Sequence, residues 1–195
     1  MANNTSVSGG CTWPGTDPLY LAYHDTEWGV PEYDSRALWE KLILDGFQAG
    51  LSWITILRKR DAFRAGFADF EPEKVARFTE ADIQRLLADP GIIRHRGKIE
   101  GTVKSAQAYL RLSEREPFAD FLWKHLDGRV LQNSYRTQGE VPTQTNVSET
   151  ISKELKRAGF TFCGPTIVYA FMEACGLVNY HLTGCFRWSE CAALA

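Results

Sequence analysis

The chain has 195 residues, of which 44% are hydrophobic and 24% charged, a composition that fits one globular domain or two small packed lobes and excludes disorder, collagen and a coiled coil. Because 22 Lys and Arg face 24 Asp and Glu, the net charge is -2, and any nucleic-acid binding has to depend on a local basic patch. The first residues lack the regions of a signal peptide and the apolar run at 167–172 is too short to span a membrane, so we expect a cytoplasmic protein without membrane contact.

The hydrophobic periodicity along the chain is helical, and strand signals are few. A cap at Asp34 or Ser35 opens the first expected helix, which runs into Asp45-Gly46 and is followed by a turn at 46–50. The further expected helices, in chain order, are a helix capped by Ser52 that carries Trp53 to Phe63, Thr79 to Asp89, a helix that starts near Gly97, Phe118 to Leu126, Ser148 to Ala158, and Pro165 to Cys175. Residues 127–145 are polar and are expected to form a long connection. The sequence therefore predicts an all-α domain of roughly seven or more short helices.

The segment between the third and fourth expected helices can bind an anion. A Pro-Gly turn at Pro90-Gly91 leads into a helix N-terminus, whose backbone N–H groups lack partners. Arg94, Arg96 and Lys98 add positive charge beside these groups, so the segment predicts a phosphate clamp. The alternative is a simple corner between two helices with solvated arginines.

Two pairs of potential metal ligands lie near the two ends of the chain. His181 and Cys185 are spaced so that one helical turn brings them together, whereas Cys11 and His24 need a loop that folds back. Four such ligands would form a closed, structural Cys₂His₂ site. The alternative is that Cys11 and His24 are unrelated surface residues and Cys185 is a buried thiol, because only half of the set is local in sequence. The odd count of five cysteines argues against a disulfide framework.

Aromatic residues are concentrated in the first quarter of the chain, and several lie where no helix is expected. These rings could stack on a flat, cationic heterocycle. The alternative is core packing, for which Trp39 has the helical spacing. Asp45 stands beside them at the expected helix end, where Asp-Gly also fits an ordinary turn. The rings outside the expected helices are Trp13, Tyr20, Tyr23 and Trp28.

Taken together, these stretches resemble the 3-methyladenine DNA glycosylase I family. The resemblance runs from about Cys11 to Cys185, and its matching segments are 17–20, 23–31, 48–55, 91–99 and 174–181. It implies a helix-hairpin-helix DNA glycosylase fold with a zinc site that joins the N- and C-terminal segments. The domain boundaries that follow are a flexible N-terminus at 1–10, a single two-lobed domain at 11–186, and a C-terminal tail at 187–195.

The resemblance also implies the roles of particular residues. Asp45 would be the catalytic carboxylate, although the family usually has Glu there, and Leu51 would be the wedge into the duplex. Pro165 and Ala170 stand where a small hydroxyl residue is commoner in relatives. The expected substrate-binding residues are Trp13, Tyr20, Tyr23, Trp28 and Trp53; the DNA-binding residues are Gln48, Leu51, Gly91, Arg94, His95, Arg96 and Lys98; and the ligands of one structural Zn²⁺ are Cys11, His24, His181 and Cys185.

The activity implied by the resemblance is the hydrolytic excision of 3-methyladenine from double-stranded alkylated DNA by a monomer. We expect no lyase step, because no lysine is evident in the pocket segments. One alternative is a non-catalytic zinc-containing helix-hairpin-helix module that binds damaged DNA. A nucleoside hydrolase that acts without DNA is another, but it leaves the basic hairpin without a role.

Overall fold

The computed structural model describes residues 10–194 and is mostly helical, which confirms the all-α expectation. The expected flexible segment at 1–10 lies outside the described residues apart from Gly10. No helix of residues 10–194 is both long and apolar enough to cross a membrane.

The helices are α1 Pro18–Thr26, α2 Ser35–Gln48, α3 Trp53–Leu57, α4 Arg60–Gly66, α5 Pro72–Val75, α6 Glu80–Ala88, α7 Arg96–Ser113, α8 Phe118–Trp123, α9 Asn146–Ala158, α10 Pro165–Ala174 and α11 Phe186–Ala192. Short 3₁₀ turns occupy Ala68–Phe70, Lys124–Leu126 and Gln138–Glu140. Strands β1, Leu131–Gln132, and β2, Val178–Asn179, form one parallel pair in which Leu131 faces Val178.

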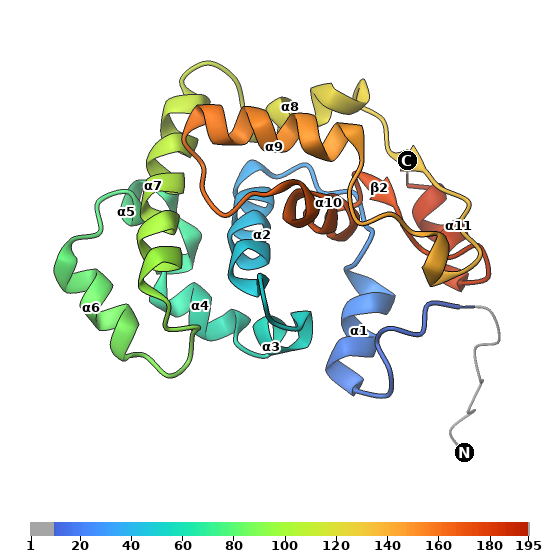
Figure 1. The fold of residues 1–195 in the computed structure, drawn as a ribbon, viewed down its shortest axis with the longest axis horizontal. Coiled ribbons are helices and arrows are strands. Elements are labelled where there is room, and N and C mark those ends of the chain that lie inside the picture. The colour runs from blue at the N-terminus through green and yellow to red at the C-terminus, as the bar shows by residue number, and fades with distance from the viewer. Residues whose placement is uncertain (1–9, 195) are drawn as a thin grey trace.

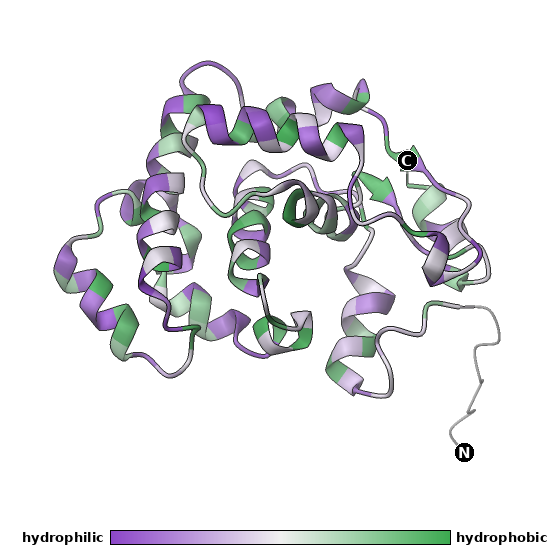
Figure 2. Cartoon of the chain, in the orientation of Figure 1, coloured by the Kyte–Doolittle hydropathy of each residue, from purple (hydrophilic) through white to green (hydrophobic). Residues whose placement is uncertain are grey.

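Helix α2 lies in the middle of the fold, with α10 beside it, α7 on one side and α9 crossing above (Figure 1). Residues 38–47 of α2 are buried except Glu40, and Leu38 and Trp39 are fully enclosed. The outer helix α9 is amphipathic. It has both hydrophilic and hydrophobic positions, and its Ile151 and Leu155 are buried (Figure 2). The core is therefore built around α2.

Helix α2 is longer than the sequence predicts. Asp34 caps it as expected, with its carboxylate accepting from the Ala37 amide at 2.8 Å. However, the helix continues through Gly46 to Gln48, so the expected turn at 46–50 begins later. The glycine serves close packing here, because a Cβ at Gly46 would lie 3.2 Å from both the Cβ and the carbonyl oxygen of Phe162. Asp45 consequently lies inside the helix and is 3% exposed.

Three helices, α1, α5 and α11, were not expected from the sequence, and the expected helix from Trp53 to Phe63 is divided into α3 and α4. Helix α1 is capped by Asp17, whose side chain accepts from two backbone amides, and it has Pro18 in its first turn. The aromatic residues that were expected in irregular chain therefore lie partly on a helix. Helix α11 falls in the expected C-terminal tail, yet its Arg187 and Cys191 are buried.

The connection between α6 and α7 has a fixed geometry. Gly91 donates to the side chain of Asp89 at 2.6 Å, and a Cβ at Gly91 would lie 2.8 Å from the Cβ of Ala62 on α4. Lys59 donates to the Pro90 carbonyl at 2.7 Å. His95 caps α7, because its Nδ1 accepts from the Lys98 amide at 3.2 Å. This connection is thus held against the α3–α4 region.

Lys98 does not lie on the surface, which corrects its expected role in the phosphate clamp. Its side chain points inward from the first turn of α7, it is 8% exposed, and burial lowers its pKa. Its Nζ donates to the carbonyls of Phe47 at 2.8 Å and Ala49 at 2.9 Å. These are carbonyls at the C-terminal end of α2 that no helical amide can reach. Lys98 therefore joins the end of α2 to the start of α7.

Replacing Lys98 by Met should lower the free energy of unfolding by about 1–3 kcal/mol, because the buried carbonyl of Phe47 and the partly buried carbonyl of Ala49 lose their donor. Urea denaturation measures this change. Lys104→Met, at an exposed position of the same helix, is the matched control and should leave stability nearly unchanged. Equal stability of the two variants would contradict the structural role.

Candidate functional site

A cavity of about 180 Å³ lies between α1, α2, α3 and α10. Pockets that hold drug-sized molecules measure roughly 300–1,000 Å³, so this cavity suits a smaller ligand. The five expected substrate-binding aromatics, Asp45 and Gln48 all line it, so the structure brings these residues together. The full lining is Trp13, Tyr20, Tyr23, Trp28, Lys41, Asp45, Gln48, Trp53, Gln138, Ala170, Glu173, Ala174 and Tyr180.

The walls of the cavity are aromatic. The Trp13 ring meets Tyr20 edge to face at 4.7 Å and Trp28 at 5.0 Å, and Tyr23 and Trp53 lie 5.6 Å apart. The indole N–H groups of Trp13 and Trp53 are buried and have no hydrogen-bond partner within residues 10–194. Such walls can hold a flat ring by stacking, and the two free donors can meet acceptors on its edge.

The floor of the cavity carries a buried ion pair. Lys41 lies one turn before Asp45 on α2, and its Nζ donates to both carboxylate oxygens, at 2.6 and 2.8 Å. Burial raises the pKa of Asp45, and the positive charge of Lys41 opposes that shift. The same Nζ lies 3.9 Å from the centre of the Trp53 ring, a cation–π contact.

A second carboxyl group enters the cavity from α10. Burial raises the pKa of Glu173 to about 8; the Tyr180 hydroxyl lowers it, and the negative charge of Asp45 adds to the rise. Tyr23, on α1, also has a raised pKa, because it is buried and faces Asp45. At neutral pH, therefore, Glu173 is mostly protonated.

Lys41 and Glu173 were missed by the sequence analysis, and the expectation that no lysine lines the pocket is wrong. The signal for Lys41 was its position four residues before Asp45, which puts both side chains on one face of a helix. No local sequence pattern identifies Glu173 as a cavity residue, because its place in the cavity depends on how α10 packs against α2.

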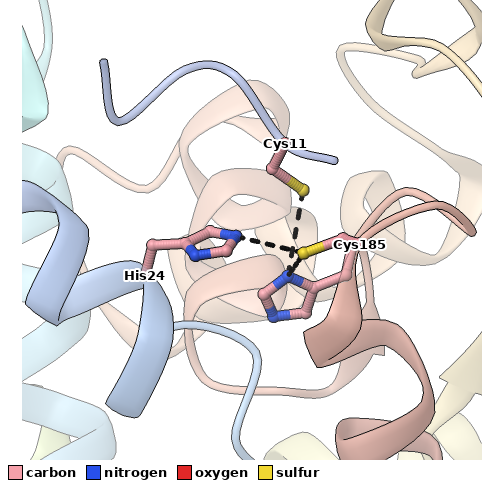
Figure 3. Close-up of side chains that lie close together, drawn as sticks. Cys11, His24 and Cys185 are labelled. Carbon is pink, nitrogen blue, oxygen red and sulfur yellow. Dashed lines mark hydrogen bonds between the residues drawn. The ribbon is translucent and has the colours of Figure 1, made fainter. Parts of the chain in front are cut away.

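The four expected metal ligands converge on one point. Cys185 Sγ lies 3.5 Å from His24 Nε2 and 3.6 Å from His181 Nδ1, and Cys11 Sγ lies 3.9 Å from His181 Nδ1. Figure 3 shows the side chains of Cys11, His24 and Cys185 pointing toward one another. Zinc bonds of about 2.0–2.3 Å in a tetrahedron put neighbouring sulfur and nitrogen atoms about 3.5 Å apart. The donor set and its spacing therefore suit a tetrahedral metal ion.

In each histidine of this Cys/His cluster, the ring nitrogen that points away from the cluster has a hydrogen-bond partner outside it. His24 Nδ1 lies 2.7 Å from the carboxylate of Asp25, and His181 Nε2 lies 3.0 Å from the Trp28 carbonyl. These partners hold the proton on the outer nitrogen of each ring and leave the inner nitrogen free to bind a metal. The cluster also touches the cavity wall, because the Trp28 ring packs on His181 at 4.6 Å and the Trp13 ring on His24 at 5.5 Å.

The expected DNA-binding residues fall at two places. Gln48 lines the cavity and Leu51 is 42% exposed in the loop that follows α2. Arg94, His95 and Arg96 are exposed beside the start of α7. The guanidinium of Arg96 already pairs with Glu80 at 2.8 Å and with Glu100 at 2.9 Å, and this pairing lowers the pKa of Glu80 to about 2. Arg94 forms no ion pair within the described part of the chain. Gly91 lies in the same corner, where its lack of a side chain allows close packing against Ala62.

Residues 13–188 match the family described as methyladenine glycosylase. DNA-3-methyladenine glycosylase 1 of Escherichia coli is 53% identical over 176 residues, which cover 90% of this chain and 94% of that protein. DNA-3-methyladenine glycosylase of Haemophilus influenzae is 47% identical, with 90% and 95% covered.

Solved structures give the same result. A crystal structure of 3-methyladenine DNA glycosylase I has a TM-score of 0.89 and 52% identity, with 91% of this chain and 98% of that one covered. The enzyme from Staphylococcus aureus, described for its recognition of 3-methyladenine, has a TM-score of 0.88 and 44% identity, with 90% and 94% covered. The chain belongs to the methyladenine glycosylase family.

Proposed function

We propose that this protein is a DNA-3-methyladenine glycosylase of base excision repair, which turns the damaged nucleotide out of double-stranded DNA and hydrolyses its glycosidic bond. The observation that carries the proposal is the small aromatic cavity with a carboxylate at its floor, in a chain whose relatives are named for this reaction. A base inside the stacked duplex cannot be reached, so the nucleotide has to leave the helix first.

The substrate explains why the reaction needs no strong general acid. Methylation at N3 puts a positive charge on the purine of the nucleotide. When water attacks C1′, the bond electrons pass to the base, which leaves as a neutral molecule. Recognition is then the main task, and each well-placed aromatic face favours a cationic ring by roughly 0.5–2 kcal/mol.

Asp45 is the catalytic carboxylate of this proposal. Both of its oxygens bind Lys41, but each has a further lone pair that can accept from the exocyclic amine of the base. Its charge also stabilises the positive charge that develops on the sugar. We infer hydrolysis without a lyase step, since the Lys41 nitrogen donates to Asp45 and offers no free lone pair.

The Cys/His cluster would hold one structural Zn²⁺. All four ligand positions come from side chains, so the ion has no open position for water and takes no part in bond cleavage. Its proposed role is to hold the segment that carries Trp13 against the C-terminal part of the chain.

DNA contact is assigned to the rim of the cavity and to the α6–α7 corner, which would form the helix-hairpin-helix element of one domain at 11–186. Leu51 would enter the duplex as a wedge, with Gln48 beside it. The start of α7 and Arg94 would bind phosphate, with His95, Gly91 and Arg96 nearby. We expect the protein to act as a monomer. The alternative is a module that binds damaged DNA without cutting it.

Incubation with methylated duplex DNA and chromatography of the released bases tests the activity. The wild type should release 3-methyladenine, whereas Asp45→Asn should release it at least about tenfold more slowly, a loss of ~1.4 kcal/mol, because a donor replaces one acceptor oxygen. Asp61→Asn changes an exposed carboxylate and is the control. Excision by Asp45→Asn at the wild-type rate would remove Asp45 from the chemistry, and no release by the wild type would favour the non-catalytic module.

Zinc should be present at one ion per chain in freshly purified protein, measured by elemental analysis. Cys11→Ser should lower both the zinc content and the melting temperature, because structural zinc couples binding to folding. Cys163→Ser is the matched control, since it removes a buried thiol outside the cluster. Absence of zinc from the wild type would contradict the assignment.

Arg94→Ala should weaken binding to duplex DNA of any sequence and reduce the slope of log affinity against log salt by roughly one unit. Arg96→Ala should have a smaller effect, because Glu80 and Glu100 already engage that side chain. Arg115→Ala, an exposed arginine beyond the other end of α7, is the control. An unchanged salt slope in Arg94→Ala would place the DNA surface elsewhere.

A further inference from the structure

One face of the Trp53 ring is already occupied by a cation. Lys41 Nζ lies 3.9 Å from the centre of this ring, inside the cavity that the proposed function assigns to the base. Cation–π attraction draws one cation to one ring face. A cationic base that stacks on this face would therefore compete with the ammonium of Lys41.

Lys41 also neutralises the carboxylate at the floor of the cavity. Its Nζ contacts both Asp45 oxygens at 2.6 and 2.8 Å, and the two side chains are 11% and 2% exposed. At this separation the positive charge of Lys41 offsets much of the negative charge that Asp45 presents to a base in the cavity. Asp45 can still accept a hydrogen bond, but its attraction for a cation is weakened.

Glu173 is the other carboxyl group that lines the cavity. It lies on α10 and lines the cavity together with the Lys41–Asp45 pair of α2, Tyr180 and Tyr23 of α1. Within residues 10–194 Glu173 forms no ion pair, whereas Asp45 is paired with Lys41. Because its pKa lies at about 8, it can lose its proton when a positive charge enters.

We propose that Lys41 and Glu173 determine how strongly the cavity prefers a charged base: Lys41 holds the cation position on Trp53 and neutralises Asp45, and Glu173 supplies the negative charge that a cationic base meets. In this arrangement a cationic base binds with loss of the Glu173 proton to solvent, whereas a neutral base binds without it. This inference rests on the proposed function, because it assumes that the cavity holds a purine.

A purely structural role for Lys41 leads to a different expectation. An ion pair between residues four apart on a helix would contribute to stability only, and its removal would lower the melting temperature without changing the preference for charge. The experiment has to separate these two roles.

Two small ligands that differ by one methyl group provide the probe. 3,9-Dimethyladeninium is permanently cationic and 9-methyladenine is neutral, so the ratio of their dissociation constants measures the preference of the cavity for charge. Lys41→Met should raise the preference for the cation at least about tenfold, equal to about 1.4 kcal/mol. Lys41→Arg keeps the charge and is the control, with a ratio within about threefold of wild type. Glu173→Gln should lower the preference at least about tenfold.

Calorimetry in two buffers of different ionisation enthalpy counts the protons released on binding. At pH 7 the wild type should release close to one proton for each cation bound and none for the neutral ligand, and Glu173→Gln should release none with either. A structural role for Glu173 would not produce this difference.

The double variant Lys41→Met/Asp45→Asn removes the whole ion pair, so it keeps the experiment informative even if Lys41→Met alone fails to fold. Its preference for the cation should return to within about threefold of wild type, whereas Asp45→Asn alone, which leaves an unpaired ammonium, should lower it at least about tenfold.

Two results would overturn the inference and leave the proposed function standing. One is a ratio of dissociation constants in Lys41→Met equal to that of the wild type. The other is a preference for the cation in the double variant as low as in Asp45→Asn. Failure of the folded wild type to bind either purine would instead overturn the assignment of the cavity.

Discussion

Helix α2 is surrounded by other helices on nearly every side, so each polar group that it carries has to find a partner inside the protein. Unpaired charges and carbonyls in such a place cost several kcal/mol. Lys41 and Asp45 pair with each other, and the carbonyls at the C-terminal end of the helix receive hydrogen bonds from Lys98. The floor of the cavity and the loop that carries Leu51 both follow from this one requirement.

The cavity depends on segments that are far apart in the chain. Its aromatic walls come from the N-terminal segment and α3, its floor from α2, and its second carboxyl group from α10. The Cys/His cluster brings the N-terminal segment to the region after β2, and the rings of Trp13 and Trp28 lie between that cluster and the cavity. The positions of the aromatic rings in the cavity wall therefore depend on the Cys/His cluster being intact.

Much of the fold could be predicted from local signals in the sequence. The starts of α2 at Asp34 and of α6 at Thr79 were predicted correctly. In the structure each is fixed by short-range hydrogen bonds, a cap at Asp34 and a capping box between Thr79 and Asp82. Helix α1 was missed, because its aromatic residues partly face a cavity rather than a continuous core. Lys98 was misplaced for a related reason: a lysine beside arginines predicts a surface charge, and only the three-dimensional position of the α2 carbonyls shows why it turns inward.

The site was partly predictable for the same physical reasons. Residue types that are rare in loops, such as tryptophan, identified the aromatic walls, and ligand chemistry identified the four members of the Cys/His cluster. The partners of Asp45 were harder to find. Glu173 reaches the cavity through the packing of α10 against α2, a contact between elements for which no local pattern exists.

The bond from Lys98 to the end of α2 has a mechanical consequence. The loop that carries Leu51 follows directly from Ala49, and the corner with Arg94 leads directly into α7, so this side chain fixes the separation between the two parts of the proposed DNA surface. If this surface binds a duplex as proposed, its two parts would keep their separation and the deformation would fall on the DNA. The bending energy of the DNA would then be part of the cost of exposing a nucleotide. Damage that weakens stacking would lower that cost, so the fixed shape of the protein would itself contribute to the selection of damaged sites.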